Sequence, residues 1–175
     1  RAFRSAALVS PTGFRSRDAT TKWRNGTRAM PRLHAFFEFP LWSEGFFRLL
    51  TSRASIRYFL KKTWGSRDID EGLLEYDYLT THQPGAQHAP YYFVSGFLFS
   101  EDITRIYHSL TLPVWMSHGV RGDFVDYTNK SQVESRANWT IRVFETGAMP
   151  HFEAEAEFIA AYDAFLAGVP SALPA

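Results

Sequence analysis

The sequence predicts an α/β fold in which parallel strands are flanked by helices. Short apolar runs typical of buried strands occur near both ends of the chain, and a long segment of helical periodicity lies between them. From residue 112 onward the order is strand, crossover, strand, helix, which makes the two strands parallel with a right-handed connection. Of 175 residues, 45% are hydrophobic and 17% aromatic, which is enough apolar material for a packed core.

The first predicted element is a buried strand at residues 5–10. Pro11, Thr12 and Gly13 follow it directly, a combination that predicts a turn. Residues 15–25 are polar and basic, which predicts a loop.

Helical periodicity begins at Pro31 and continues to Leu79. Pro31 suits the first position of a helix, where its missing N–H costs nothing. Ser43 is expected to cap the next helix, and Ser52 or Ser55 the one after it.

Further boundaries divide the rest of the helical segment. Gly65 is expected to end the third helix, and Asp68 to cap the fourth. Residues 83–85 (Gln-Pro-Gly) break the pattern. Residues 89–99 then fit either a helix or a short strand, and residues 101–110 predict the last helix of the segment.

The period of the pattern changes after residue 111. Residues 112–116 predict a buried strand, residues 129–137 a helical crossover, residues 139–144 a second strand, and residues 152–166 a final helix. The apolar face expected for that helix consists of Phe158, Ile159, Tyr162, Phe165 and Leu166.

Chemistry is expected in the two loops that follow these strands, because parallel sheets bind ligands at the carboxyl ends of their strands. The first loop contains Asp123 and Asp126, and the second contains His151. A carboxylate bonded to the Nδ1–H of a histidine fixes the tautomer that leaves Nε2 free to act as a base. These residues therefore predict two members of a nucleophile–histidine–acid triad. We expect His118 to serve the structure of the first loop.

At this point the chain resembles the α/β-hydrolase superfamily. The matching stretches are residues 113–119 (Pro-Val-Trp-Met-Ser-His-Gly) and residues 147–153 (Gly-Ala-Met-Pro-His-Phe-Glu). The order of acid before histidine also matches, and Asp123 precedes His151 by 28 positions, room for one helix and one strand. The resemblance implies an esterase-like hydrolase in which His151 is general base and acid, and Asp123 orients it.

The resemblance extends to the beginning of the chain. Residues 8–13 resemble the strand that follows the nucleophile's helix, and the helical segment resembles an inserted cap. The chain starts without methionine and enters a strand at once, so we expect the C-terminal part of a longer hydrolase, inactive alone. The expected divisions are a core strand at 1–14, a helical cap with a linking helix at 15–110, the core with both loops at 111–168, and a tail at 169–175.

One position departs from the family pattern. The acid commonly follows the His-Gly pair as Gly-x-x-Asp, but that position is Gly122 here and Asp123 comes one residue later. Asp123 is the first choice for the acid because a glycine can relax the loop, and Asp126 is the reserve.

No nucleophile elbow is found in the chain. The elbow needs small residues two positions before and after the nucleophile. Ser10, Ser95 and Ser117 lack this pattern on one or both sides, and the chain has no cysteine. The nucleophile, most often serine in this family, is therefore expected outside the sequence. A non-catalytic hydrolase-like protein that binds a ligand or partner stays as an alternative, as does an independent α/β binding module.

Composition limits the partners. The formal net charge of +1 gives no reason to expect nucleic acid, and no cofactor or metal site is expected. His82 and His88 lack a carboxylate at ligand spacing. The longest apolar run, 89–99, is too short for a membrane span, and with no signal peptide or cysteine we expect a cytoplasmic protein. Numerous cap aromatics predict a small apolar or aromatic substrate, while the oligomeric state stays open.

Overall fold

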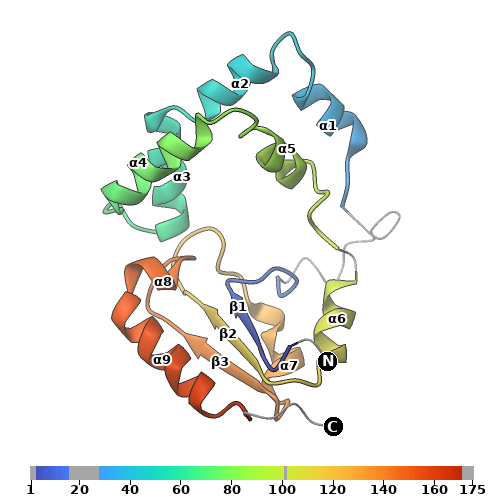
Figure 1. The fold of residues 1–175 in the computed structure, drawn as a ribbon, viewed down its shortest axis with the longest axis vertical. Helices are drawn as coiled ribbons and strands as arrows, with labels where there is room; N and C mark the ends of the chain where they lie inside the picture. Colours follow the sequence, from blue (N-terminus) through green and yellow to red (C-terminus); the bar gives the residue numbers. More distant parts are fainter. Residues whose placement is uncertain (1–2, 16–27, 101, 171–175) are drawn as a thin grey trace. The chain divides into compact units, whose positions relative to one another are not determined.

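The computed structural model describes residues 3–15, 28–100 and 102–170 (Figure 1). The chain divides into two compact units, which we name the sheet unit and the helical unit. The sheet unit contains Arg1–Thr20, Thr63–Ser66 and Thr104–Ala175, and the helical unit contains Thr21–Lys62 and Arg67–Ile103. From residue 16 on, the loop expected at residues 15–25 lies outside the described residues, as do residues 171–175 of the expected tail.

The sheet unit is built on three strands, β1 (Ala6–Val9), β2 (Val114–His118) and β3 (Trp139–Val143), in the order β1-β2-β3. Ala6 pairs with Val114, and Val114 pairs with Trp139, both in parallel ladders. The parallel arrangement predicted from the sequence is therefore confirmed. β2 is central and buried along its whole length, as expected for a strand covered on both faces.

Helices cover both faces of this sheet. They are α6 (Ile103–Ser109), the short 3₁₀ turn η2 (Thr128–Lys130), α7 (Ser131–Glu134), α8 (Pro150–Glu153) and α9 (Glu155–Ala167). Figure 1 shows α9 on one side of the sheet and α6 and α7 on the other. Trp115 is buried against Phe158 and Tyr162 of α9, with ring centroids 5.1 Å apart in both pairs. On the opposite face, Phe14 stacks on Tyr107 of α6 at 5.0 Å.

The final helix differs from the prediction. It is divided into α8 and α9 by Ala154, whose φ of −133° and ψ of 51° are not helical. The division lets the last residue of α8, Glu153, turn its carboxylate back to the Gly147 amide while α9 follows the sheet. The predicted apolar face is only partly covered, because Ile159 and Leu166 remain 49% and 41% exposed.

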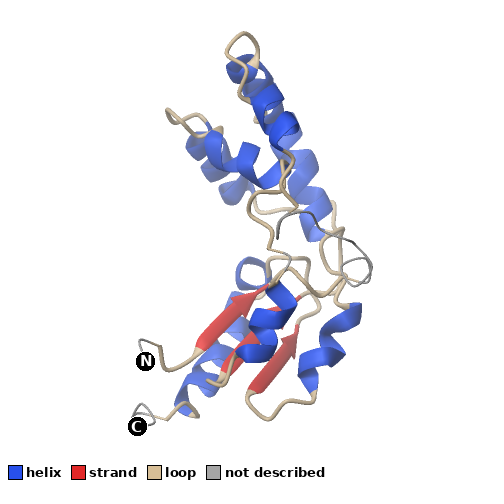
Figure 2. Ribbon diagram, turned by 90° about the vertical axis from the view of Figure 1, so that its right-hand side faces the viewer, coloured by secondary structure: helices blue, strands red, loops and turns tan. Residues whose placement is uncertain are grey.

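The helical unit contains α1 (Pro31–Phe37), α2 (Ser43–Leu50), α3 (Arg53–Trp64), α4 (Glu71–Thr81) and α5 (His88–Val94). α3 continues from the helical unit into residues 63–66, which belong to the sheet unit. The segment at residues 89–99, which fits either a helix or a strand by its sequence, begins as helix α5. The helix ends before Gly96, whose φ is 82°. Figure 2 shows strands in the sheet unit alone among the described residues.

Both backbone and side-chain contacts join these helices. The Met30 amide, just before α1, donates to the Ser95 carbonyl, just after α5, at 2.8 Å. Tyr91 is 1% exposed, stacks on Phe37 at 5.2 Å and donates its hydroxyl to the Ser43 carbonyl at 2.6 Å. Across α3 and α4, the guanidinium of Arg53 binds the carboxylate of Glu75 through two nitrogens, at 2.9 and 2.8 Å. Arg57 and Glu71 form a second two-point pair one turn away.

Two of the predicted helix caps are wrong. Ser43 is the first residue of α2 and makes no capping bond, because Trp42 occupies the N-cap position. α4 is capped by Asp70 instead of Asp68, since Asp70 has an extended backbone and accepts a bond from the Leu73 amide at 2.9 Å.

None of the helices in the described part of the chain has the length and apolar character required to cross a membrane.

Candidate active site

The loops that follow β2 and β3 meet at the carboxyl edge of the sheet. Gly119 and Gly147 lie so close that a side chain on Gly119 would collide with the Gly147 carbonyl. The Thr146 carbonyl accepts hydrogen bonds from two amides of the first loop, Val120 at 2.9 Å and Arg121 at 3.0 Å. The two loops predicted to carry chemistry therefore touch backbone to backbone.

A half-buried ion pair joins the same two loops. The Arg121 guanidinium donates to the carboxylate of Glu153 at 2.6 Å, and the Glu153 side chain is only 9% exposed. The second oxygen of Glu153 accepts the Gly147 amide at 2.7 Å. Arg121 also donates to the carbonyl of Trp64, the last residue of α3, at 3.3 Å.

His151 lies in α8, in the loop that follows β3. Its ring packs against Phe152 at 4.6 Å and Phe158 at 5.7 Å. Nδ1 is buried and has no hydrogen-bond partner among the described residues. Burial lowers the pKa of the His151 imidazole below its ordinary value of 6.5, since the charged form loses hydration. The neutral form that a general base requires is thereby favoured.

The two candidate acids lie in different surroundings. Asp123 is exposed and follows Gly122, whose φ of 91° is in the left-handed region that favours glycine. Asp126 is half-buried and accepts bonds from the amide and hydroxyl of Thr128, at 3.2 and 2.7 Å. Neither carboxylate bonds to Nδ1 of His151 in this structure. The strands bring Asp123 and His151 to one edge, and the predicted hydrogen bond is not formed.

His118, the last residue of β2, has partners at both ring nitrogens. Its Nδ1 lies 2.8 Å from the Gly119 carbonyl, which can only accept, so this nitrogen donates. Nε2 is then an acceptor for the Lys130 ammonium at 3.4 Å. Burial, and secondarily the Lys130 charge, lower the pKa of His118 below 6.5. The ring stacks on Tyr127 at 4.1 Å, so His118 is part of the loop's support.

Three residues of this region, Ser10, Arg121 and Glu153, were not predicted as parts of the site. Ser10 directly follows β1, has a φ of 47° and donates its hydroxyl to the Ala148 carbonyl at 2.5 Å. A non-glycine residue in the left-handed region is uncommon and often marks a functional site. In the sequence, Glu153 is indistinguishable from an ordinary acidic residue in the first turn of a helix.

The serines tested as elbow candidates lie in settings unlike that of a nucleophile. The Ser10 hydroxyl is engaged by the Ala148 carbonyl. Ser95 belongs to the helical unit, is fully buried and donates to the Tyr91 carbonyl. Ser117 is fully buried inside β2.

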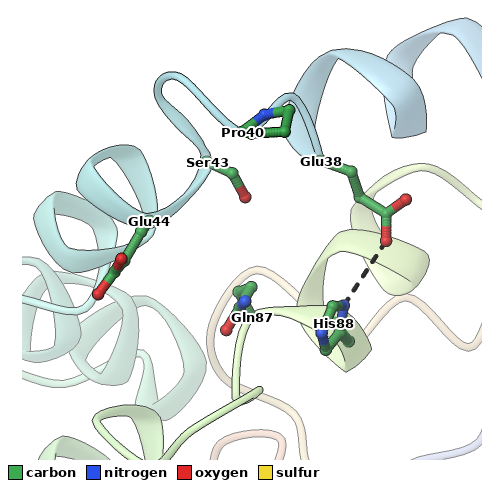
Figure 3. Close-up of a pocket in the computed structure, with 6 residues that line it drawn as sticks. All are labelled: Glu38, Pro40, Ser43, Glu44, Gln87 and His88. Carbon is green, nitrogen blue, oxygen red and sulfur yellow. Dashed lines mark ion pairs between the residues drawn. The ribbon is translucent and has the colours of Figure 1, made fainter.

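A hollow of about 430 Å³ lies within the helical unit (Figure 3). It is lined by Glu38, Pro40, Ser43, Glu44, Gln87 and His88. The Glu38 carboxylate lies 3.6 Å from Nδ1 of His88 and 3.3 Å from Nδ1 of His34. Five of these six residues are polar or charged, and none is a phenylalanine, tyrosine or tryptophan, so this hollow is not the aromatic-lined pocket expected from the sequence. Within the described residues, no cluster of three or more His, Cys, Asp or Glu side chains could hold a metal ion.

Comparison with known proteins finds similarity at the level of structure. No protein-family profile matches the chain, and no curated protein matches it in sequence. Among solved structures, an esterase from Exiguobacterium antarcticum matches with a TM-score of 0.63 and 11% identity, over 94% of this chain and 57% of the esterase. A meta-cleavage product hydrolase from Pseudomonas fluorescens matches with a TM-score of 0.54 and 17% identity, over 91% and 54%.

A third structure extends the same comparison. The 2-hydroxy-6-oxo-6-phenylhexa-2,4-dienoate hydrolase from a Rhodococcus species matches with a TM-score of 0.58 and 11% identity, over 95% of this chain and 56% of the enzyme. The chain thus spans little more than half the length of each of these proteins. At such low identity the likeness concerns the fold alone.

Proposed function

We propose that this chain, which has the α/β-hydrolase fold, supplies the acid and the histidine of an enzyme that hydrolyses an ester or a related carbonyl bond. The observation that carries the proposal is the junction of the two loops after β2 and β3. The loop of Asp123 and the loop of His151 are bonded to each other at the carboxyl edge, where parallel sheets bind their ligands.

In this mechanism His151 acts through Nε2. It takes a proton from the nucleophile as that atom attacks the carbonyl carbon, and returns the proton to the leaving group. Asp123 binds Nδ1–H and stabilises the imidazolium that forms. The lowered pKa of His151 keeps the ring neutral, and so able to accept a proton, near neutral pH.

The nucleophile and the oxyanion donors come, in this proposal, from a part of the fold outside this sequence. None of Ser10, Ser95 and Ser117 has an elbow pattern, and the compared hydrolases are nearly twice as long as the matched region. The chain alone is therefore expected to be inactive. His151 must also turn its Nδ1 toward Asp123 in the assembled site, a tightening that occurs in many enzymes only in the complex.

We further propose that the substrate carries an apolar or aromatic group. The helical unit exposes a cluster of aromatic rings in which Trp42 lies 5.2 Å from Phe36 and 4.4 Å from Phe39. Their exposed fractions are 53% for Phe36, 47% for Phe39 and 38% for Trp42. Apolar rings of this kind suit the wall of a pocket for such a group. One of the compared enzymes is named for a substrate that contains a phenyl ring.

The test is made on the complete product of the gene that encodes this chain, with aryl esters as substrates. His151→Gln is expected to lower kcat by roughly 10⁴-fold, because both proton transfers are lost. Asp123→Asn should lower kcat as well, and Asp126→Asn should not. The control is His108→Gln, which removes an exposed histidine from α6 and should leave the rate unchanged. Full activity in His151→Gln would overturn the assignment.

A second candidate function is non-catalytic binding of a ligand or partner on a hydrolase scaffold. The arrangement of His151 supports it, because the ring packs on Phe152 and Phe158 and its buried Nδ1 has no partner among the described residues. If the complete protein binds aryl esters but its rate is equal in the unsubstituted and His151→Gln forms, this second function is favoured.

A further inference from the structure

The carboxylate of Glu153 is the most enclosed charge between the two loops. A buried carboxylate is costly unless hydrogen bonds and an opposite charge compensate it. Glu153 obtains both, from the Gly147 amide at 2.7 Å and the Arg121 guanidinium at 2.6 Å. Its side chain is 9% exposed and that of Arg121 is 40% exposed, so water enters the pair from the arginine side.

The same group of bonds reaches the end of α3. The last carbonyls of a helix have no partners within it. Here the Thr63 carbonyl accepts the Ala148 amide at 2.9 Å, and the Trp64 carbonyl accepts Arg121 at 3.3 Å. Each loop therefore caps one carbonyl of α3, and the pair between Arg121 and Glu153 links the two caps.

Glycines allow the two loops to pack closely against the end of α3. A side chain on Gly147 would lie 2.5 Å from the Thr63 carbonyl oxygen and 2.5 Å from the Trp64 Cα. One on Gly65, which follows α3, would meet the backbone of Gly122. The backbone that leads into Asp123 and the backbone that leads into His151 are thus both packed against the end of α3. The two carboxylate oxygens of Glu153 bind different loops, one the Gly147 amide and the other the Arg121 guanidinium.

We infer that Glu153 is a positioning residue, which holds the loop of His151 against the loop of Asp123 by binding Arg121 and the Gly147 amide. It does not touch the reacting atoms. The inference rests on the proposed function, because it assigns Glu153 to that site. If so, the charge of Glu153 controls the position of the His151 imidazole relative to the Asp123 carboxylate.

The first test needs no catalysis and is made on the complete product of the gene that encodes this chain. Glu153→Gln keeps the size of the side chain and an oxygen for the Gly147 amide, but loses the charge that binds Arg121. NMR should report faster hydrogen exchange at the Gly147 amide, by roughly tenfold, since bonds to charged groups are the stronger ones. The imidazole signals of His151 should shift with it. The matched control is Glu157→Gln, which removes an ion pair with Arg142 whose partners are 57% and 53% exposed.

Arg121→Lys serves as the second variant if Glu153→Gln does not fold. Lysine keeps the charge but cannot bind the Trp64 carbonyl and Glu153 through separate nitrogens in a planar fork. A shift of the His151 signals in the same direction supports the inference. Unchanged Gly147 exchange and unchanged His151 signals in the folded variants overturn it.

The second test uses the complete protein and separates kcat from KM. Glu153→Gln should lower kcat about tenfold or more with little change in KM, because misplacement of a catalytic group affects the transition state. Equal kcat in Glu153→Gln and Glu157→Gln would overturn the positioning role. Absence of hydrolysis by the unsubstituted protein would overturn the proposed function, while the NMR result on Gly147 would still decide whether Glu153 holds the loops.

Discussion

In the sheet unit, the two loops and the end of α3 touch backbone to backbone, whereas in the helical unit α3 and α4 are joined through side chains. The helical unit has a backbone contact elsewhere, where the Met30 amide donates to the Ser95 carbonyl at 2.8 Å. Gly119 contacts Gly147, and Gly147 contacts the end of α3, in the sheet unit. In the helical unit, α3 and α4 are linked by Arg53 and Glu75, whose side chains are 54% and 52% exposed. Exposed ion pairs contribute little to stability. The difference indicates that the loops of the candidate site are held by tight backbone packing, while α3 and α4 are linked by exposed side chains.

The burial of hydrophobic side chains differs in the same way. Three consecutive residues of β2, Val114, Trp115 and Met116, are each at most 1% exposed. The helical unit leaves large apolar side chains open to solvent, among them Leu41 at 82% and Leu49 at 70%. The helical unit therefore has the smaller hydrophobic core, and we expect it to unfold after a smaller loss of apolar contacts than the sheet unit.

The largest predicted effect is that of Trp115→Ala in the sheet unit. Removing this ring from its contacts with Phe158 and Tyr162 leaves a cavity and should lower the free energy of unfolding by about 3–5 kcal/mol. Leu74→Ala in the helical unit, also at 1% exposure, should cost about 2–5 kcal/mol. Urea unfolding measures both, with Leu49→Ala as the exposed control. A larger loss in Leu74→Ala than in Trp115→Ala would break the comparison.

A smaller effect is expected where the two loops meet. Gly119→Ala forces a methyl group against the Gly147 carbonyl and should lower the free energy of unfolding by roughly 1–3 kcal/mol. Gly45→Ala in α2 is the matched substitution in the helical unit, because nothing lies within 4 Å of the added carbon. It should raise the free energy of unfolding by about 0.5–1 kcal/mol, since alanine favours a helix interior. Equal changes in the two variants would show that the loop junction is not rigid.

The smallest effect concerns pH and His118. Burial first, and the Lys130 charge second, lower the pKa of its imidazole below the ordinary value of 6.5. The unfolded chain therefore takes up the proton at a higher pH than the folded chain. The stability that the neutral ring contributes is complete above about pH 6.5 and is lost as pH falls toward the folded pKa.

Urea unfolding at about pH 7.5 and about pH 5.5 measures this loss. His118→Gln should reduce the difference between the two pH values. His88→Gln, which removes an exposed histidine of the helical unit, is the control. An unchanged difference in His118→Gln would contradict the role of burial. His151 shifts in the same direction as His118, so part of the loss should remain in this variant.

The fold was largely predictable, and so was the resemblance to α/β-hydrolases, which the structural comparisons confirm. Apolar runs gave the strands, and Pro31 and Gly65 mark a helix start and a helix end as expected. The two wrong caps have different causes. Asp68 and Asp70 stand close together, and only the backbone angles decide which one caps α4. At α2 the helix begins one residue earlier than expected, so Ser43 lies inside it and Trp42 precedes it without a side-chain cap. The assignment of Asp123 and His151 to catalysis stays a prediction.

The sequence by itself determined where the strands lie along the chain, because periodicity and turn residues act over a few neighbouring positions. Their parallel direction followed from the strand–crossover–strand pattern, while their order in the sheet came from the structure. It also indicated which loops would meet, since parallel strands bring their carboxyl ends to one edge. Only the tertiary structure decided that Ser10 would bind Ala148, that Thr63 and Trp64 would be capped by the loops, and that Nδ1 of His151 would be buried. These contacts join residues up to 138 positions apart. Such distant partners are fixed by the packing of the whole unit, which no local pattern records.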